Sequence, residues 1–307
     1  MLLLTHPACL RHDNGEGHPE CPDRLRAVLR ALETQEFSTL VRASAPEATR
    51  EQLLRVHPEA HVERILSTRP AEGRRIHLDA DTSMNAHSAE AALRAAGAGV
   101  EAVDSVMRGE FLRAFCAVRP PGHHAEPAEP MGFCLFANAA VAARHAQAAH
   151  GVERVAVLDF DVHHGNGTQA CFEHDPSLML VSSHQTPLYP GTGAASETGA
   201  GNILNLPLAP GTDGPAFRRV WEAQGLPAVE AFAPGLIIVS AGFDAHRLDP
   251  LAALRLAEDD FAWVTEAIAA VANRVCGGRV VSMLEGGYDL HALARSTAAH
   301  VRALMHA

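Results

Sequence analysis

One short stretch near the middle of the chain carries the residue types of a metal site. An apolar, β-branched run, Arg154 to Phe160, leads directly into Asp161 and His163 and is then broken by glycine. Residues two apart on an extended backbone point to the same side, so this carboxylate and imidazole converge at the end of the predicted strand. Together they form half of a site for a divalent metal. His164 should point the other way on an extended chain, and we assign it no role.

Three further polar clusters also follow predicted strands. Arg119 to His124 comes after one apolar run, Gly242 to Asp244 after a second, and Glu285 to Tyr288 after a third. In open parallel sheets, ligands bind outside the carboxyl ends of the strands. Because all four clusters fall at such ends, we expect them to meet at one rim of a sheet.

The side chains in these clusters predict metal-assisted hydrolysis of an amide. Asp161, His163 and Asp244 supply three protein ligands and leave one position open for water, which is the pattern of a catalytic zinc rather than a structural one. Such a metal lowers the pKa of water to about 7 and polarises a carbonyl group.

The remaining polar residues supply the groups that this chemistry needs. His123 and His124 provide a base for the water and an acid for the leaving amine. Asp159 is placed to orient one of these imidazoles, and Asn166 could hold the other. Tyr288, on a turn with two glycines, is the hydrogen-bond donor expected for a developing oxyanion.

The pattern of the rest of the chain predicts an α/β fold of three layers (αβα) with a central, mostly parallel sheet, because continuous apolar strands alternate with helices. No repeat or linker interrupts this pattern, so residues 1–307 are expected to form a single catalytic domain. We expect strands at 2–5, 115–118, 154–160, 178–182, 203–206, 236–240 and 279–284. We expect helices at 22–35, 60–66, 88–107, 138–150, 168–173, 215–231 and 259–275, a short one capped by Thr49, and a last one capped by Asp289.

Composition excludes several classes of function. The net charge of −11 without a basic cluster argues against nucleic acid as a direct partner. No apolar run approaches the ~20 residues that a membrane-spanning helix needs. All 25 basic residues are arginine, which excludes a lysine nucleophile or Schiff base. The six cysteines include no CxxC pair, so we expect neither a zinc knuckle nor a disulfide framework, and a reduced, cytoplasmic compartment.

Taken together, the motifs resemble the signatures of the histone deacetylase superfamily, which has the arginase-deacetylase fold. The similarity is greatest to the class II deacetylases and the bacterial histone deacetylase-like amidohydrolases, and it extends over nearly the whole chain. The segments that carry it are Arg119–Pro127, Met131–Cys134, Asp159–Gln169, Ser240–Asp244, Leu284–Tyr288 and, near the N-terminus, His18–Glu20 with Arg24 and Leu25.

This resemblance implies a role for each residue of the predicted site. His124 would be the general base and acid, and His123 a mainly electrostatic partner backed by Asp159. Tyr288 would polarise the acetyl carbonyl of the substrate. The implied zinc ligands are Asp161, His163 and Asp244.

The resemblance also implies features that the residues alone do not predict. Phe133 and Tyr189 look like two walls of a tunnel for an acyl-lysine side chain. A structural potassium ion is implied, bound mostly by main-chain oxygens. Its implied residues are Asp159, Asp161, His163, Ser182 and Ser183.

Two departures within the family bear on tuning and on substrate. Asn166 stands where class I deacetylases have an aspartate, which fits class II and changes how His124 is tuned. Leu251 occupies what looks like the gatekeeper position, where polyamine-selective members carry a glutamate that attracts a cationic polyamine. We therefore expect an acyl-lysine substrate or another small acylated amine with a neutral tail, with acetylpolyamine hydrolysis as the alternative.

Two other classes are disfavoured. A ureohydrolase resembling arginase needs two manganese ions and additional aspartates, and Gly165 and Gly242 stand where that family would place them. A non-catalytic binding protein on the same fold would be indicated by loss of Tyr288, His124 or a metal ligand, and all of these are present.

Overall fold

The computed structural model describes residues 1–307, and a parallel β-sheet forms its centre. Its strands are β1 (Leu2–Thr5), β2 (Val41–Ser44), β5 (Arg113–Cys116), β6 (Val155–Asp159), β7 (Leu178–Gln185), β8 (Ile203–Leu208), β9 (Leu236–Ala241) and β10 (Val280–Leu284). They lie in the order β2-β1-β5-β10-β9-β6-β7-β8. Every pairing between these neighbours is parallel.

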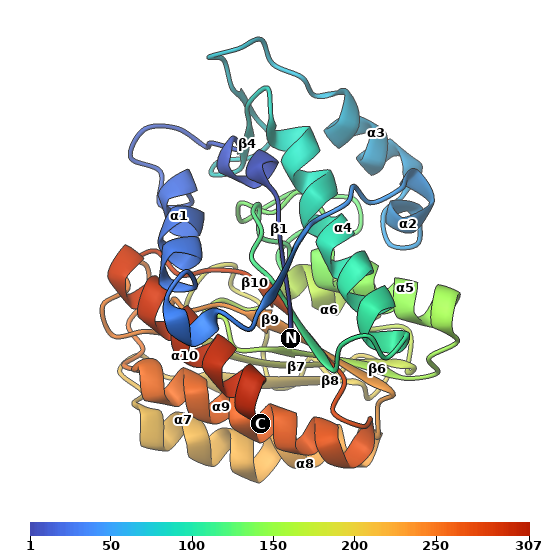
Figure 1. The fold of residues 1–307 in the computed structure, drawn as a ribbon, viewed down its shortest axis with the longest axis vertical. Helices are drawn as coiled ribbons and strands as arrows, with labels where there is room; N and C mark the ends of the chain where they lie inside the picture. The colour runs from blue at the N-terminus through green and yellow to red at the C-terminus, as the bar shows by residue number, and fades with distance from the viewer.

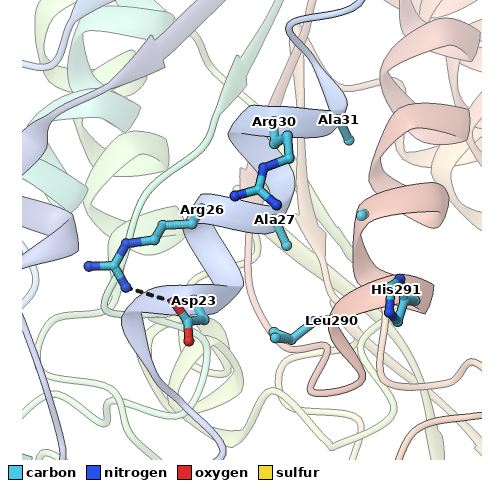
Figure 2. Close-up of a pocket in the computed structure, with 8 residues that line it drawn as sticks. Asp23, Arg26, Ala27, Arg30, Ala31, Leu290 and His291 are labelled. Carbon is cyan, nitrogen blue, oxygen red and sulfur yellow. Dashed lines mark hydrogen bonds and ion pairs between the residues drawn. The ribbon is translucent and has the colours of Figure 1, made fainter.

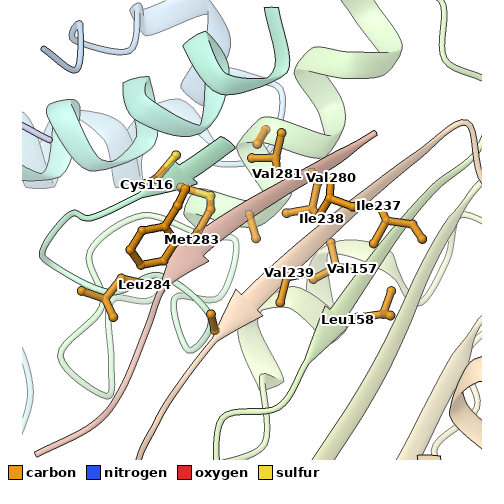
Figure 3. Packing of buried hydrophobic residues seen from close by; sticks show 14 of the residues in the cluster. Cys116, Val157, Leu158, Ile237, Ile238, Val239, Val280, Val281, Met283 and Leu284 are labelled. Atoms are coloured by element: carbon orange, nitrogen blue, oxygen red, sulfur yellow. The ribbon is translucent and has the colours of Figure 1, made fainter. Parts of the chain in front are cut away.

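The central strands are apolar on both faces because both faces are covered. Val157 of β6 pairs in register with Ile238 of β9, which pairs in turn with Val281 of β10. All three side chains are fully buried, and Figure 3 shows such residues packed in rows across the strands. Continuous apolar strands of this kind are typical of parallel sheets between two helical layers.

The helices form those two layers (Figure 1). α4 (Ser88–Met107) and α5 (Asn138–His150) pack on one face of the sheet, and α7 (Gly214–Val220), α8 (Leu226–Phe232), α9 (Glu258–Val275) and α10 (Leu290–His306) lie on the other. The remaining helices are α1 (Pro22–Ala31), which packs on α10, α2 (Arg50–Leu54), α3 (Glu59–Ser67) and α6 (Asn166–Phe172). The predicted three-layer α/β fold is confirmed. None of the helices combines the length and the apolar character needed to cross a bilayer.

Several predicted elements differ in their bounds, and some were not predicted. The expected helix 215–231 contains a π-helical turn at Trp221–Gly225, between α7 and α8. Pro227 follows this turn, and it cannot donate a hydrogen bond to the preceding turn of a regular α-helix. The expected helix 22–35 ends at Ala31, and a 3₁₀ turn follows at Gln35–Phe37. The edge strand β2 and the short hairpin of β3 (Ile76–His77) and β4 (Ser83–Met84) were not predicted.

Candidate active site

The polar clusters meet at the carboxyl ends of four neighbouring strands. β5, β10, β9 and β6 are adjacent in the sheet, and the segments that follow them carry the predicted catalytic and zinc-binding residues. Such a rim is where open parallel sheets place their ligands. The expected convergence of the four clusters is therefore present in the fold.

Three side chains form a buried donor set of two carboxylates and one imidazole. One ligand atom from each of Asp161, His163 and Asp244 lies within 4.8 Å of the others. His163 Nδ1 is 3.1 Å from Asp161 Oδ1 and 3.1 Å from Asp244 Oδ2. The backbone N–H groups of Val162 and Gly286 donate to the two carboxylates and fix their orientation. This combination of oxygen and nitrogen donors suits zinc.

Electrostatics and packing indicate that this donor set is built for a cation. Burial and the neighbouring Asp161 carboxylate raise the pKa of Asp244 to about 7. Burial opposes protonation of His163, but its contacts with the two carboxylates raise its pKa to about 10. Added Cβ atoms at Gly242 and Gly286 would lie 2.1 Å from Asp161 Oδ2 and Asp244 Oδ2, respectively. Only glycine leaves this cradle open.

The adjacent histidines lie beside the donor set with different partners. His123 Nδ1 is 2.9 Å from Asp159 Oδ2, and His124 Nδ1 is 2.8 Å from Asn166 Oδ1. Burial lowers the pKa of His123, but Asp161 and Asp159 outweigh burial and hold that pKa well above its usual range. Burial and the charges of His123 and His163 hold the pKa of His124 well below its usual range. Two titratable groups whose pKa values are pushed apart are typical of acid and base assignments.

Glu285 holds the backbone of the loop that carries His123 and His124, a role that was not predicted from its motif. This fully buried carboxylate accepts hydrogen bonds from the backbone N–H groups of Gly122 (2.7 Å) and His123 (3.2 Å), and from the hydroxyl of Ser240 (3.2 Å). Burial raises the pKa of Glu285 to about 7. The carboxylate therefore links the end of β10 to the loop that follows β5.

Tyr288 is held by its backbone and by a buried arginine. Its N–H donates to Asp249 Oδ2 at 2.7 Å. The Arg24 guanidinium lies 4.8 Å from the centroid of the Tyr288 ring and donates to the carbonyl groups of Glu285 (2.5 Å) and Gly287 (2.6 Å). Burial raises the pKa of the Tyr288 hydroxyl well above its usual range, so the group stays protonated and can donate.

A pocket of about 240 Å³ opens onto these groups. It brings together His124, His163 and Tyr288 with the three residues expected to contact substrate. Its lining residues are Asp81, His124, Gly132, Phe133, His163, Leu188, Tyr189, Leu251 and Tyr288. Asp81 was missed, because it lies in the loop of the unpredicted β3–β4 hairpin.

Two glycines leave no room for further carboxylates around the donor set. A Cβ atom at Gly165 would lie 2.4 Å from Asp159 Oδ2, and one at Gly242 would lie 2.1 Å from Asp161 Oδ2. Real side-chain atoms do not approach so closely. An aspartate at either position, where a two-metal ureohydrolase would need one, would therefore displace Asp159 or Asp161.

A second group of metal-ligating residues lies away from the pocket. Nε2 of His145 and Nε2 of His150 approach the same oxygen of Asp104, at 2.7 and 2.6 Å. Arg55 donates to Nδ1 of His145 at 3.0 Å, which leaves the proton of that imidazole on Nε2. A metal ligand needs the opposite arrangement, with Nδ1–H donating to an acceptor. This group is therefore a hydrogen-bonded link between α4 and α5.

A wider hollow of about 410 Å³ lies on the surface between α1 and α10. Figure 2 shows Asp23 and Arg26 paired at its edge, with Arg30, Leu290 and His291 around it. It contains none of the residues of the donor set or of the histidine pair. The predicted catalytic and substrate-binding residues that reach a pocket line the smaller one.

Comparison with known proteins identifies the family. A model described as the histone deacetylase domain matches residues 18–304. The chain is 42% identical to histone deacetylase 14, chloroplastic, of Arabidopsis thaliana, over 99% of this chain and 76% of that protein. It is also 42% identical to the histone deacetylase-like amidohydrolase of Pseudomonas aeruginosa, over 89% of this chain and 73% of that protein.

A solved structure agrees with these matches. The crystal structure of the HDA15 HD domain superposes with a TM-score of 0.93 at 36% identity, covering 99% of this chain and 88% of that one. Zinc dependence is typical of this family. The chain therefore belongs to the histone deacetylase family and is a deacetylase.

Proposed function

We propose that the protein is a zinc-dependent amidohydrolase that removes an acetyl or other acyl group from the side chain of an acyl-lysine. The observation that carries this proposal is the shared pocket: His163 of the donor set, the unprotonated His124 and the protonated Tyr288 all line one cavity of about 240 Å³, and Asp161 and Asp244 lie against His163. Each of these groups has a defined part in hydrolysis of an amide.

The proposed zinc ligands are Asp161, His163 and Asp244. Their convergence, their burial and the glycine cradle around their carboxylates fit a divalent cation, and one imidazole with two carboxylates suits zinc. Zinc bound there would polarise the substrate carbonyl and lower the pKa of a water molecule to about 7.

His124 is proposed as the general base and then the general acid. Asn166 Nδ2 donates to a carboxylate oxygen of Glu126 at 2.9 Å, so its Oδ1 faces His124 and accepts a hydrogen bond from the Nδ1–H group of that imidazole. Nε2 of His124 is left with a free lone pair. Because the pKa of His124 is depressed, this nitrogen is unprotonated at neutral pH and can accept a proton from water.

The other residues of the site stabilise charge and orientation. His123 is proposed as an electrostatic partner, protonated because the carboxylates of Asp161 and Asp159 hold its pKa well above the usual range. Tyr288 is proposed to donate its hydroxyl hydrogen to the developing oxyanion, and the contacts of Arg24 hold its loop in place.

The proposed substrate is an acyl-lysine rather than an acylated polyamine. Phe133 and Tyr189 line the pocket as its aromatic walls, and Leu251 adds an uncharged side chain. An apolar wall suits the methylene chain of lysine and gives no attraction to a polycation. Asp81, which also lines the pocket, favours the second candidate, an acetylpolyamine, because a carboxylate attracts ammonium groups.

A structural potassium ion is proposed beside the zinc site. Asp159, the last residue of β6, pairs in register with Ser182 of β7, which supports this proposal. The hydroxyl groups of Ser182 and Ser183 already bond His184 and Trp221, which leaves main-chain oxygens for the ion. The proposed residues are Asp159, Asp161, His163, Ser182 and Ser183.

The single domain over residues 1–307 and the cytoplasmic location stay predictions.

The test combines metal content with turnover. The purified protein should contain about one zinc per chain and release acetate from an acetyl-lysine peptide faster than from acetylspermidine. Tyr288→Phe should keep its zinc but lose about 10²–10³-fold in kcat, the effect of removing one oxyanion donor. The matched control is Tyr189→Phe, at the only other tyrosine, which should retain kcat. Full activity of Tyr288→Phe would refute the oxyanion role, and faster turnover of acetylspermidine would reverse the choice of substrate.

A further inference from the structure

We propose that His164 is a positioning residue for the substrate pocket. With His184, it fixes the loop Leu188–Gly193, so that Tyr189 stands against His124 at the pocket wall. This inference rests on the proposed function, because the loop lines the pocket that would receive the acyl-lysine.

His164 follows a proposed zinc ligand directly, yet both of its ring nitrogens have partners outside the donor set. Nδ1 lies 2.8 Å from the Thr192 hydroxyl oxygen, and Nε2 lies 2.9 Å from Gln169 Oε1. The ring is buried, with 1% of the residue exposed. His164 therefore connects the end of β6 to the loop that carries Tyr189.

The surrounding hydrogen bonds define which nitrogen of His164 carries the proton. Gln169 Nε2 donates to a carboxylate oxygen of Glu197 at 2.8 Å, so Gln169 Oε1 faces His164 as an acceptor. Asn205 Nδ2 also donates to Gln169 Oε1, at 2.8 Å. Nε2–H of His164 is therefore the donor, and Nδ1 accepts from the Thr192 hydroxyl. The Thr192 hydroxyl is the loop's direct side-chain link to His164.

The imidazole rings of His184 and His164 pack together against the Gly193 end of the loop Leu188–Gly193. The centroids of His164 and His184 are 4.8 Å apart, and His184 Nε2 donates to the Gly193 carbonyl at 2.9 Å. Gly193 has a φ of +88°, and a Cβ atom there would lie 2.5 Å from His184 Nε2 and 2.6 Å from His164 Cγ. Only glycine adopts this backbone readily and leaves room for the rings.

The anchored end of the loop lies three residues from Tyr189. Glu197 accepts hydrogen bonds from the N–H groups of Gly193 (3.1 Å) and Ala194 (2.9 Å), which ties down the same end from the other side. Tyr189 itself is 39% exposed, and its ring centroid lies 5.2 Å from that of His124. Because the tip is exposed, its position depends on the anchors at Thr192 and Gly193. Loosening them should widen the pocket and weaken substrate binding, while leaving the donor set in place.

The test removes one hydroxyl from the loop and leaves the metal site untouched. Thr192→Val keeps the shape of the side chain but leaves Nδ1 of His164 without a donor. We expect KM for an acetyl-lysine peptide to rise about fivefold or more, with kcat within about twofold of the wild type and with unchanged zinc. Hydrogen exchange of the amides in residues 188–194 should quicken by a similar factor. Thr192→Ser keeps the hydroxyl and should restore both KM and exchange. His164→Ala should show the changes of Thr192→Val, and at least as large.

The alternative outcomes separate the two levels of the proposal. Unchanged KM and loop exchange in Thr192→Val would overturn the role of His164. Loss of zinc in His164→Ala, with Thr192→Val silent, would also overturn it, because His164 would then act on the metal site. If the wild type fails to hydrolyse acyl-lysine peptides, the proposed function fails. The exchange rates of Thr192→Val and Thr192→Ser still decide whether His164 holds the loop.

Discussion

Replacing Glu20 by glutamine should destabilise the protein strongly, because this residue neutralises two buried arginines. The Glu20 carboxylate is fully buried and contacts the guanidinium groups of Arg24 and Arg119, the latter with Arg119 Nη2 to Oε2 at 2.7 Å. Asn14 donates to the same carboxylate at 2.9 Å. Glutamine fills the same volume but removes the negative charge. Both guanidinium groups would then be buried without a counter-charge.

The expected loss follows from this geometry. Removing one partner of a buried ion pair costs about 3–5 kcal/mol. A chain of 307 residues has an unfolding entropy of about 0.6 kcal/mol/K, so the melting temperature should fall by about 5–8 °C. Because Arg24 also holds the backbone around Tyr288, deacetylase activity should fall in the same variant.

Thermal and urea unfolding measure the loss, and an exposed pair provides the control. Glu36 pairs with Arg302 at the surface, with Nη2 to Oε2 at 2.9 Å, and Glu36→Gln should cost no more than about 1 kcal/mol. Burial opposes ionisation of Glu20, but Arg119 and His12 hold its pKa well below the ordinary value of 4.5. The stabilisation is therefore present above pH 4.5 and lost as the pH falls through the folded-state pKa, so the wild type and Glu20→Gln should converge in acid. If Glu20→Gln lowered the free energy of unfolding by as little as Glu36→Gln does, this reasoning would be refuted.

Three further predictions concern the metal and the pocket. Zinc binding to the metal-free protein should release protons, because the pKa of His163 is about 10 and that of Asp244 about 7. Calorimetry in buffers of different ionisation enthalpy should detect this proton release. The affinity for zinc should rise about tenfold per pH unit near neutrality for each proton released. Leu251→Glu should raise kcat/KM for acetylspermidine about tenfold relative to an acetyl-lysine peptide, and an unchanged ratio would remove Leu251 from the selectivity argument. His150→Ala should leave zinc content and activity unchanged, whereas loss of a zinc equivalent would show that the Asp104 group binds metal.

Sequence periodicity predicts the buried elements best. The bounds of α4 and α5 agree with those expected, and so does the cap of α10, where Asp289 accepts from Ala292 N–H at 2.8 Å. The strand β2 was missed because it is a four-residue edge strand whose side chains are mostly exposed, so it has no apolar run. The π-helical turn before Pro227 depends on packing that periodicity does not register.

Some features of the site were likewise predictable from the sequence, and others were not. The convergence of Asp161, His163 and Asp244 was predictable, because these residues lie just beyond apolar runs and such runs end at one rim of a parallel sheet. The supporting contacts of Glu285 and Arg24 were not predictable, because each joins backbone groups far away in the chain: Arg24 reaches the carbonyl of Gly287. Residue types do not show which distant carbonyl a buried arginine will meet.

The position of β10 in the sheet has a consequence for folding. This strand comes last in the chain, yet it lies between β5 and β9. Until β10 inserts, the part of the sheet that carries His123 and His124 has no strand pairing with the part that carries the proposed zinc ligands. Long-range pairing of this kind is slow, since the intervening chain must be ordered first. The histidine pair and the proposed zinc ligands are therefore joined through the sheet only once β10 has inserted, and a ribosome-bound chain that lacks β10 should be inactive.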